Sequence, residues 1–232
     1  MPFDQERRPP EPGGGTHERA INLPPAILWL ILINVAVQGI RELLGDAVDN
    51  QIIGQFGLIP LHYTSNGAAD WLSLIGAPIA YQFLHGGWIH LGVNMLSLAA
   101  FGAPVERLLG PRRFVLFYLV TGIVAGAVHI AIFADSPDPV IGASGAISGV
   151  FGAVLVLMRR GGALSSLLPI AGVWIALNIF FGVVGGTPGA EGQPVAWAAH
   201  IAGFVFGLIA IRFFVPRPPV LPDLPDPPQD PG

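Results

Sequence analysis

Apolar residues along the chain gather into six long runs, separated by short breaks that are polar or rich in glycine and proline. The runs predict helices at about 26–40, 89–108, 114–134, 144–159, 166–185 and 196–215. The first helix can extend through Leu43 and Leu44 if the Arg41 side chain reaches back to the membrane surface. Crossing about 30 Å of hydrocarbon takes about 20 helical residues, so the fourth run needs help from its ends. The pattern predicts an all-α membrane protein, a bundle of six transmembrane helices.

Polar segments flank this predicted membrane domain, which covers residues 24–215. Residues 1–23 are rich in proline and glycine and predict a disordered tail. Residues 216–232 hold eight prolines and predict a second extended, exposed tail. Between the first two helices, residues 41–88 predict a long loop that lies partly in the membrane interface. Three aromatic residues of this loop are expected in the interface: Trp71, Tyr81 and Trp88.

Composition supports a membrane environment. Only 11% of the residues are charged and 52% are hydrophobic, whereas roughly 25% of the residues of a soluble domain are charged. A soluble fold of this size could not cover its surface with so few charges. The net charge of −4 is too small to indicate nucleic-acid binding. The expected surroundings are a lipid bilayer and other membrane proteins.

The arginines give an orientation to the six predicted helices. With a cytoplasmic N-terminus, ten of the eleven arginines fall on the cytoplasmic side and only Arg41 falls outside. Positive charges near membrane spans favour the cytoplasmic side. The sequence therefore predicts a multi-pass protein of a bacterial-type inner membrane, with both termini in the cytoplasm.

Missing residue types exclude several chemistries. The chain has no cysteine and no lysine, which excludes a thiol nucleophile and a Ser–Lys dyad. No Asp, Glu or Arg lies in the middle of a predicted span, so the residues of an aspartyl protease or a proton-coupled transporter are missing. The only His-Glu pair begins at His17, and Ile21 stands where a zinc protease would have its second histidine.

A few polar residues do lie within the predicted spans. Because unpaired polar groups are costly in a membrane, each is a functional candidate. Asn94 follows His90 by one helical turn, so both lie on one face, and both can donate hydrogen bonds. Ser144 lies where an outer loop turns into the fourth helix, near N–H groups that favour an anion. His200 lies near the same outer end of the sixth helix.

Glycines provide a way to bring these residues together. Gly145 and Gly149 in the fourth helix, and Gly203 and Gly207 in the sixth, form patterns that permit close helix packing. If these faces meet, the Ser144 hydroxyl lies opposite the His200 ring. Gly142, before the serine, leaves room for another backbone or a substrate.

Simpler roles compete with function at several positions. A serine such as Ser148 usually bonds back to its own helix. His129 is expected to pack, and Asn34 and Asn178 to form hydrogen bonds between helices. A metal site is a further alternative, formed by three histidines: His85, His90 and His200. No carboxylate accompanies them, so neither a metal nor a cofactor is expected.

Three segments resemble motifs of the rhomboid family of intramembrane serine proteases. Residues 83–94, FLHGGWIHLGVN, resemble its second-helix signature. Residues 142–149, GASGAISG, resemble its nucleophile motif, and residues 199–207, AHIAGFVFG, resemble its sixth-helix histidine motif. Residues 101–110 resemble the usual end of the second helix. Order, spacing and expected topology agree over about residues 24–215.

This resemblance implies a rhomboid-like bundle that cleaves transmembrane segments of other proteins. It implies that Ser144 is the nucleophile and that His200 is the general base and then the general acid. It further implies an oxyanion hole made by His90, Asn94 and the backbone N–H of Ser144. The family's dyad has no acidic third member, which fits the missing membrane carboxylates here.

The chain departs from a bacterial branch of the family in two ways. Ser148 stands where that branch has a tyrosine stacked on the histidine, and the first loop has no Trp-Arg pair. Two other functions stay open at this point. One is a catalytically inactive relative that binds membrane clients, and the other is a small channel, for which the sequence offers no charged pathway.

Overall fold

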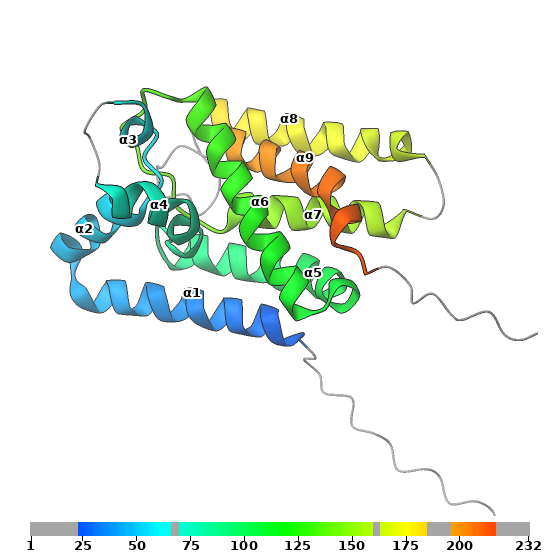
Figure 1. The fold of residues 1–232 in the computed structure, drawn as a ribbon, viewed down its shortest axis with the longest axis horizontal. Helices are drawn as coiled ribbons and strands as arrows, with labels where there is room; N and C mark the ends of the chain where they lie inside the picture. Colours follow the sequence, from blue (N-terminus) through cyan, green and yellow to red (C-terminus); the bar gives the residue numbers. More distant parts are fainter. Residues whose placement is uncertain (1–22, 66–69, 160–162, 185–195, 217–232) are drawn as a thin grey trace, which may run out of the picture.

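This computed structural model describes residues 23–65, 70–159, 163–184 and 196–216, and the described part is helical. The elements are α1 Pro25–Leu44, α2 Asp46–Phe56, α3 Leu61–Thr64, α4 Trp71–Ala80, η1 Tyr81–Phe83, α5 Trp88–Leu109, α6 Pro111–Ile132, α7 Ser144–Met158, η2 Leu164–Leu167, α8 Leu168–Val184 and α9 Trp197–Phe214. Side by side in the bundle lie α1, α5, α7, α9 and α8, in that order, and α6 runs across them (Figure 1).

The six predicted helices correspond to α1, α5, α6, α7, α8 (with η2 before it) and α9, with ends that differ by a few residues. Five of them are long and apolar enough to cross a membrane. The remaining helix, α7, has 15 residues, about 22 Å at about 1.5 Å per residue. The all-α membrane bundle is therefore confirmed, whereas a full sixth span by α7 stays a prediction.

Helix α7 is the centre of the bundle and packs against α5, α6 and α9. Its residues from Gly145 to Val150 are all buried. Close contact with α9 depends on glycine: a methyl group at Gly203 would overlap the Gly145 carbonyl oxygen, and one at Gly207 would overlap the Gly149 carbonyl oxygen. The two helix backbones touch where glycine provides no side chain.

The connection between α1 and α5 differs from the predicted loop because it contains α2, α3, α4 and η1. Asp70 starts α4 by accepting a hydrogen bond from the Ser73 N–H at 2.8 Å, which is an N-cap. Trp71 and Trp88 are exposed, as expected for interface residues. The expectation for Tyr81 is wrong: it is 1% exposed, and its hydroxyl donates to the Gly122 carbonyl at 2.6 Å.

The same connection holds the loop that precedes α7. Leu58 and Val140 exchange two backbone hydrogen bonds of 3.0 and 2.9 Å. The Gly142 N–H donates to the Tyr81 carbonyl at 2.9 Å. These backbone bonds fix where α7 begins, and with it the position of Ser144.

Glu106 anchors the start of α1. Pro24, the N-cap residue of that helix, has no side chain that can cap it. The buried carboxylate of Glu106 accepts hydrogen bonds from the N–H groups of Ala26 and Ile27, each at 2.9 Å. A carboxylate at a helix N-terminus satisfies free N–H groups and is favoured by the helix dipole. The predicted tails, 1–23 and 216–232, lie almost entirely outside the described residues.

Candidate active site

Ser144 is the first residue of α7, and its backbone N–H has no partner within the helix because of that position. Gly142, two residues earlier, has a φ of 125°, a backbone conformation open mainly to glycine. A methyl group there would lie 3.0 Å from His90 Nε2 and 3.7 Å from Ser144 Oγ. Because Gly142 has no side chain, the Ser144 hydroxyl and the His90 ring can both lie close to this stretch of backbone.

His200, in the first turn of α9, lies against this serine. Its Nε2 atom is 2.7 Å from Ser144 Oγ. The contact follows from the close packing of α7 on α9, because Gly145 and Gly203 stand one and three residues after the two polar residues. The structure thus brings the Ser144 hydroxyl and the His200 ring into contact, as the glycine pattern of the two helices predicts.

Asn178 from α8 binds the other ring nitrogen of His200, with Oδ1 2.8 Å from Nδ1. The Asn178 amide is oriented by its own helix, since Nδ2 donates to the Trp174 carbonyl at 2.9 Å. Oδ1 can only accept, so Nδ1 of His200 carries the proton. Nε2 is then free to accept a proton from Ser144.

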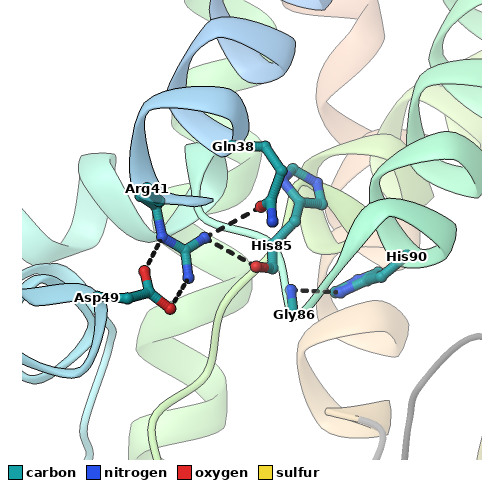
Figure 2. Close-up of polar contacts among 6 residues, drawn as sticks. All are labelled: Gln38, Arg41, Asp49, His85, Gly86 and His90. Atoms are coloured by element: carbon teal, nitrogen blue, oxygen red, sulfur yellow. Dashed lines mark hydrogen bonds and ion pairs between the residues drawn. The ribbon is translucent and has the colours of Figure 1, made fainter. Parts of the chain in front are cut away.

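His90 approaches from the first turn of α5. The Gly86 N–H donates to its Nδ1 atom at 3.2 Å, which leaves the proton on Nε2 (Figure 2). The Nε2 edge lies against Gly142, two residues before Ser144. An N–H donor beside a serine nucleophile is what an oxyanion site requires.

Asn94 lies one turn further along α5 and is buried. Its Nδ2 atom donates to the His90 carbonyl at 3.1 Å. A carboxamide nitrogen carries two protons, so this bond uses one of them. The second proton is available to a neighbouring acceptor.

The remaining polar candidates differ in their surroundings. Ser148 bonds back to the Ser144 carbonyl at 2.8 Å, which confirms the expected bond to its own helix. Asn34 also bonds within its helix, to Leu30 at 2.8 Å, so the expected bond to another helix is wrong. His129 packs on Phe133, with ring centroids 4.8 Å apart. In the described part of the chain, no group of three or more His, Asp or Glu residues is arranged to hold a metal ion.

Comparison with known proteins shows the family of this chain. The family model of the rhomboid domain matches residues 71–217, which include Ser144, His200 and His90. The chain belongs to the rhomboid family. It is 33% identical over 192 residues to rhomboid protease GluP of Bacillus subtilis, an alignment that covers 82% of this rhomboid and 35% of GluP.

Two eukaryotic relatives match a larger share of this rhomboid. It is 30% identical to mitochondrial rhomboid protein 1 of Saccharomyces cerevisiae, over 90% of its own length and 57% of the yeast protein. It is also 30% identical to rhomboid-related protein 2 of the mouse, over 86% of its length and 68% of the mouse protein. The aligned regions thus span from 35% to 68% of the length of these curated relatives.

The expected hydrogen bond of Asn178 to another helix is confirmed, but two partners in the site could not be predicted. The partner of Asn178, His200, lies 22 positions away and no local pattern indicates it. The Gly86 contact with His90 requires the turn between η1 and α5, which only the fold defines. A polar residue in an otherwise apolar helix, as Asn178 is in α8, was the one available signal.

Proposed function

We propose that this rhomboid is an intramembrane serine endopeptidase that cleaves membrane-spanning segments of other proteins. The observation that carries the proposal is the 2.7 Å contact between Ser144 Oγ and His200 Nε2 at the start of a buried helix. A hydroxyl paired with an imidazole, beside N–H donors, is the arrangement that peptide hydrolysis requires.

In the proposed reaction, Ser144 Oγ attacks the scissile carbonyl carbon and its proton passes to His200 Nε2. Asn178 accepts a hydrogen bond from the ring's Nδ1–H throughout, and so holds the tautomer and stabilises the imidazolium. His200 then gives the proton to the leaving amine as the C–N bond breaks. His200 Nε2 then takes a proton from water, which attacks the carbonyl carbon of the acyl-serine. As the bond from that carbon to Ser144 Oγ breaks, His200 returns the proton to Oγ and the acid is released.

The negative oxygen of the tetrahedral intermediate needs fixed donors. We assign this role to the Ser144 N–H, the Nε2–H of His90 and the free Nδ2 proton of Asn94. The placement of His90 Nε2 opposite Gly142 supports the assignment, as does the position of Ser144 at a helix N-terminus.

The substrate class follows from the location of the site. A peptide bond inside a helix is shielded by that helix's own hydrogen bonds, so the substrate must unwind before attack. Segments with glycine, proline or polar residues near the membrane boundary unwind most easily. Small side chains should be preferred at the cut, because His90 and Ser144 both lie close to the backbone at Gly142 and leave little room there.

We also propose the orientation indicated by the arginines, with both termini in the cytoplasm of a bacterial-type inner membrane. The site then opens to the outer face. In the fold, α2, α3 and α4 lie at the end of the bundle where α5, α7 and α9 begin (Figure 1). This end holds the proposed catalytic residues, and water must reach it.

Labelling with a fluorophosphonate probe, which reacts with activated serines, tests the proposal. The detergent-purified chain is expected to be labelled, and both Ser144→Ala and His200→Ala are expected to lose labelling. Ser148→Ala is the matched control, because Ser148 lies one turn away and bonds only to its own helix. A wild-type chain that folds but is not labelled would instead be a rhomboid relative that binds membrane clients without cleaving them.

A further inference from the structure

The segment between η1 and α5, residues 84–87, is held by a buried arginine of α1 (Figure 2). Arg41 is 4% exposed, and its Nη1 atom donates to the His85 carbonyl at 2.8 Å. The same nitrogen donates to Gln38 Oε1 at 3.2 Å. Arg41 is the one arginine that the predicted topology places on the outer side, and here it contacts the loop that leads to His90.

Asp49 from α2 balances the charge of this arginine. Its carboxylate binds the guanidinium through both oxygens, by an Nε–Oδ1 contact and an Nη2–Oδ2 contact of 3.1 Å. A buried cation without a partner would strongly destabilise the fold. A bidentate pair also fixes the plane of the guanidinium, so the Nη1 donor is held at a defined position.

The peptide unit between His85 and Gly86 connects the arginine to the candidate oxyanion site. Its carbonyl oxygen accepts from Arg41, and its N–H donates to His90 Nδ1 at 3.2 Å (Figure 2). A peptide unit is planar and rigid, so fixing its oxygen also fixes the direction of its N–H. A cation at the oxygen polarises the unit and strengthens the N–H as a donor.

The contact is made by the backbone of His85 and not by its ring. Burial, helped by His90 and Arg41, lowers the pKa of the His85 ring to about 3, so the ring is neutral at physiological pH. No ring charge opposes the guanidinium. The arginine therefore acts on the peptide, and through it on His90.

We propose that Arg41 and Asp49 are positioning residues that hold the His85–Gly86 peptide so that His90 keeps its proton on Nε2, directed at the oxyanion. The proposal rests on the proposed function, since it assigns a task to the same site. Without the arginine, the peptide can rotate and its N–H can leave Nδ1. His90 could then carry its proton on Nδ1 and present a lone pair to the developing negative charge, which would repel it.

A double-mutant cycle tests whether Arg41 acts through His90. Cleavage of a single-span substrate in detergent is measured for wild type, Arg41→Gln, His90→Ala and the double variant. Arg41→Gln is expected to lower kcat by about 10-fold to 100-fold with little change in KM. In the His90→Ala background, the same substitution is expected to change kcat less than about twofold, because the group it positions is gone.

Equal losses in both backgrounds, or an unchanged kcat, would overturn the proposal. Arg212→Gln is the control, since Arg212 is exposed near the end of α9 and rests on the Phe213 ring 4.6 Å away. These outcomes differ from a failure of the proposed function, in which Ser144→Ala would cleave the substrate as fast as wild type.

A second variant covers the case in which Arg41→Gln does not fold. Replacing both charges, as Arg41→Met with Asp49→Leu, removes the donor and leaves no unpaired buried charge, an exchange that is often neutral or stabilising. This variant is expected to keep the wild-type unfolding temperature and to show the same loss of kcat. A stable double variant with wild-type kcat would overturn the proposal.

Discussion

Asn178 Oδ1 lies 2.8 Å from His200 Nδ1, and this contact joins α8 to the pair formed by Ser144 and His200. The span Ser165–Val183, which contains most of α8, is the least enclosed of the five long apolar spans: 11% of its most apolar stretch is buried, against 39% in α9. The proposed dyad thus has a neutral third member, supplied by a helix that is largely exposed at the edge of the described bundle. The position of α8 and the tautomer of His200 are coupled through one hydrogen bond.

Removing the Asn178 carboxamide should slow catalysis more than it weakens the fold. We expect Asn178→Ala to lower kcat on the order of 10-fold to 100-fold, because His200 loses the acceptor that orients its ring and fixes its proton. Helix α8 keeps its apolar contacts with α9, such as that between Trp174 and Phe204. Steady-state cleavage and thermal unfolding of the same preparation separate the two effects.

The same substitution at Asn34 provides the control. Asn34 is also buried, but it bonds within α1 to Leu30. Asn34→Ala should leave kcat within about twofold of wild type, as expected for a residue outside the site. An Asn178→Ala variant as active as Asn34→Ala would show that His200 needs no third member.

Loss of an oxyanion donor should reduce the rate strongly. We expect His90→Ala and Asn94→Ala each to lower kcat by about 10²-fold to 10³-fold, since such donors act mainly in the transition state. Ground-state binding of substrate, and therefore KM, should change little. If either variant raised KM at an unchanged kcat, that residue would belong to substrate binding and not to the oxyanion site.

Close contact of α7 and α9 should be sensitive to a single methyl group. Gly203→Ala would place a carbon against the Gly145 carbonyl oxygen, so we expect a loss of stability of about 1–3 kcal/mol and a displaced His200. Gly172→Ala in α8 meets no atom within 4 Å and should be neutral or slightly stabilising. Thermal unfolding in detergent compares the stability of the two variants. Equal stability would show that α7 and α9 do not depend on glycine for their contact.

Glu106 should matter for stability and not for the chemical step. We expect Glu106→Ala to cost about 2–3 kcal/mol, because the N–H groups of Ala26 and Ile27 lose a charged acceptor. Folded Glu106→Ala should retain wild-type kcat below its unfolding temperature. A loss of kcat without a loss of stability would give this carboxylate a role in the site.

The helices and their order could be predicted because apolar runs of membrane length are a strong local signal. The pairing of Ser144 with His200 could also be predicted, since the glycines that allow α7 and α9 to touch stand beside both residues. The short helices α2, α3 and α4 could not. Their segments are brief and of mixed polarity, and a capping contact such as Asp70 with Ser73 is decided by local geometry.

Contacts between side chains and backbone groups that are far apart in the sequence could not be predicted from local patterns. Tyr81 is an aromatic residue in a loop of mixed polarity, which predicts a place in the membrane interface. Its hydroxyl instead donates a hydrogen bond to the Gly122 carbonyl oxygen inside the bundle. In the sequence, Arg41 is the one arginine that departs from the preference of positive charges for the cytoplasmic side. In the fold, it is buried and donates a hydrogen bond to the His85 carbonyl oxygen. In both cases the partner comes from another helix or turn, and only tertiary packing selects it.

The proposed mechanism depends on Ser144 as the nucleophile of a membrane protease. Its most direct test is cleavage of a single-span protein by the full chain in proteoliposomes, with the product mass locating the cut. We expect wild type to cut within or at the edge of the membrane segment, and Ser144→Ala to be slower by at least about 10³-fold. Cleavage by Ser144→Ala at the wild-type rate would show that Ser144 is not the nucleophile.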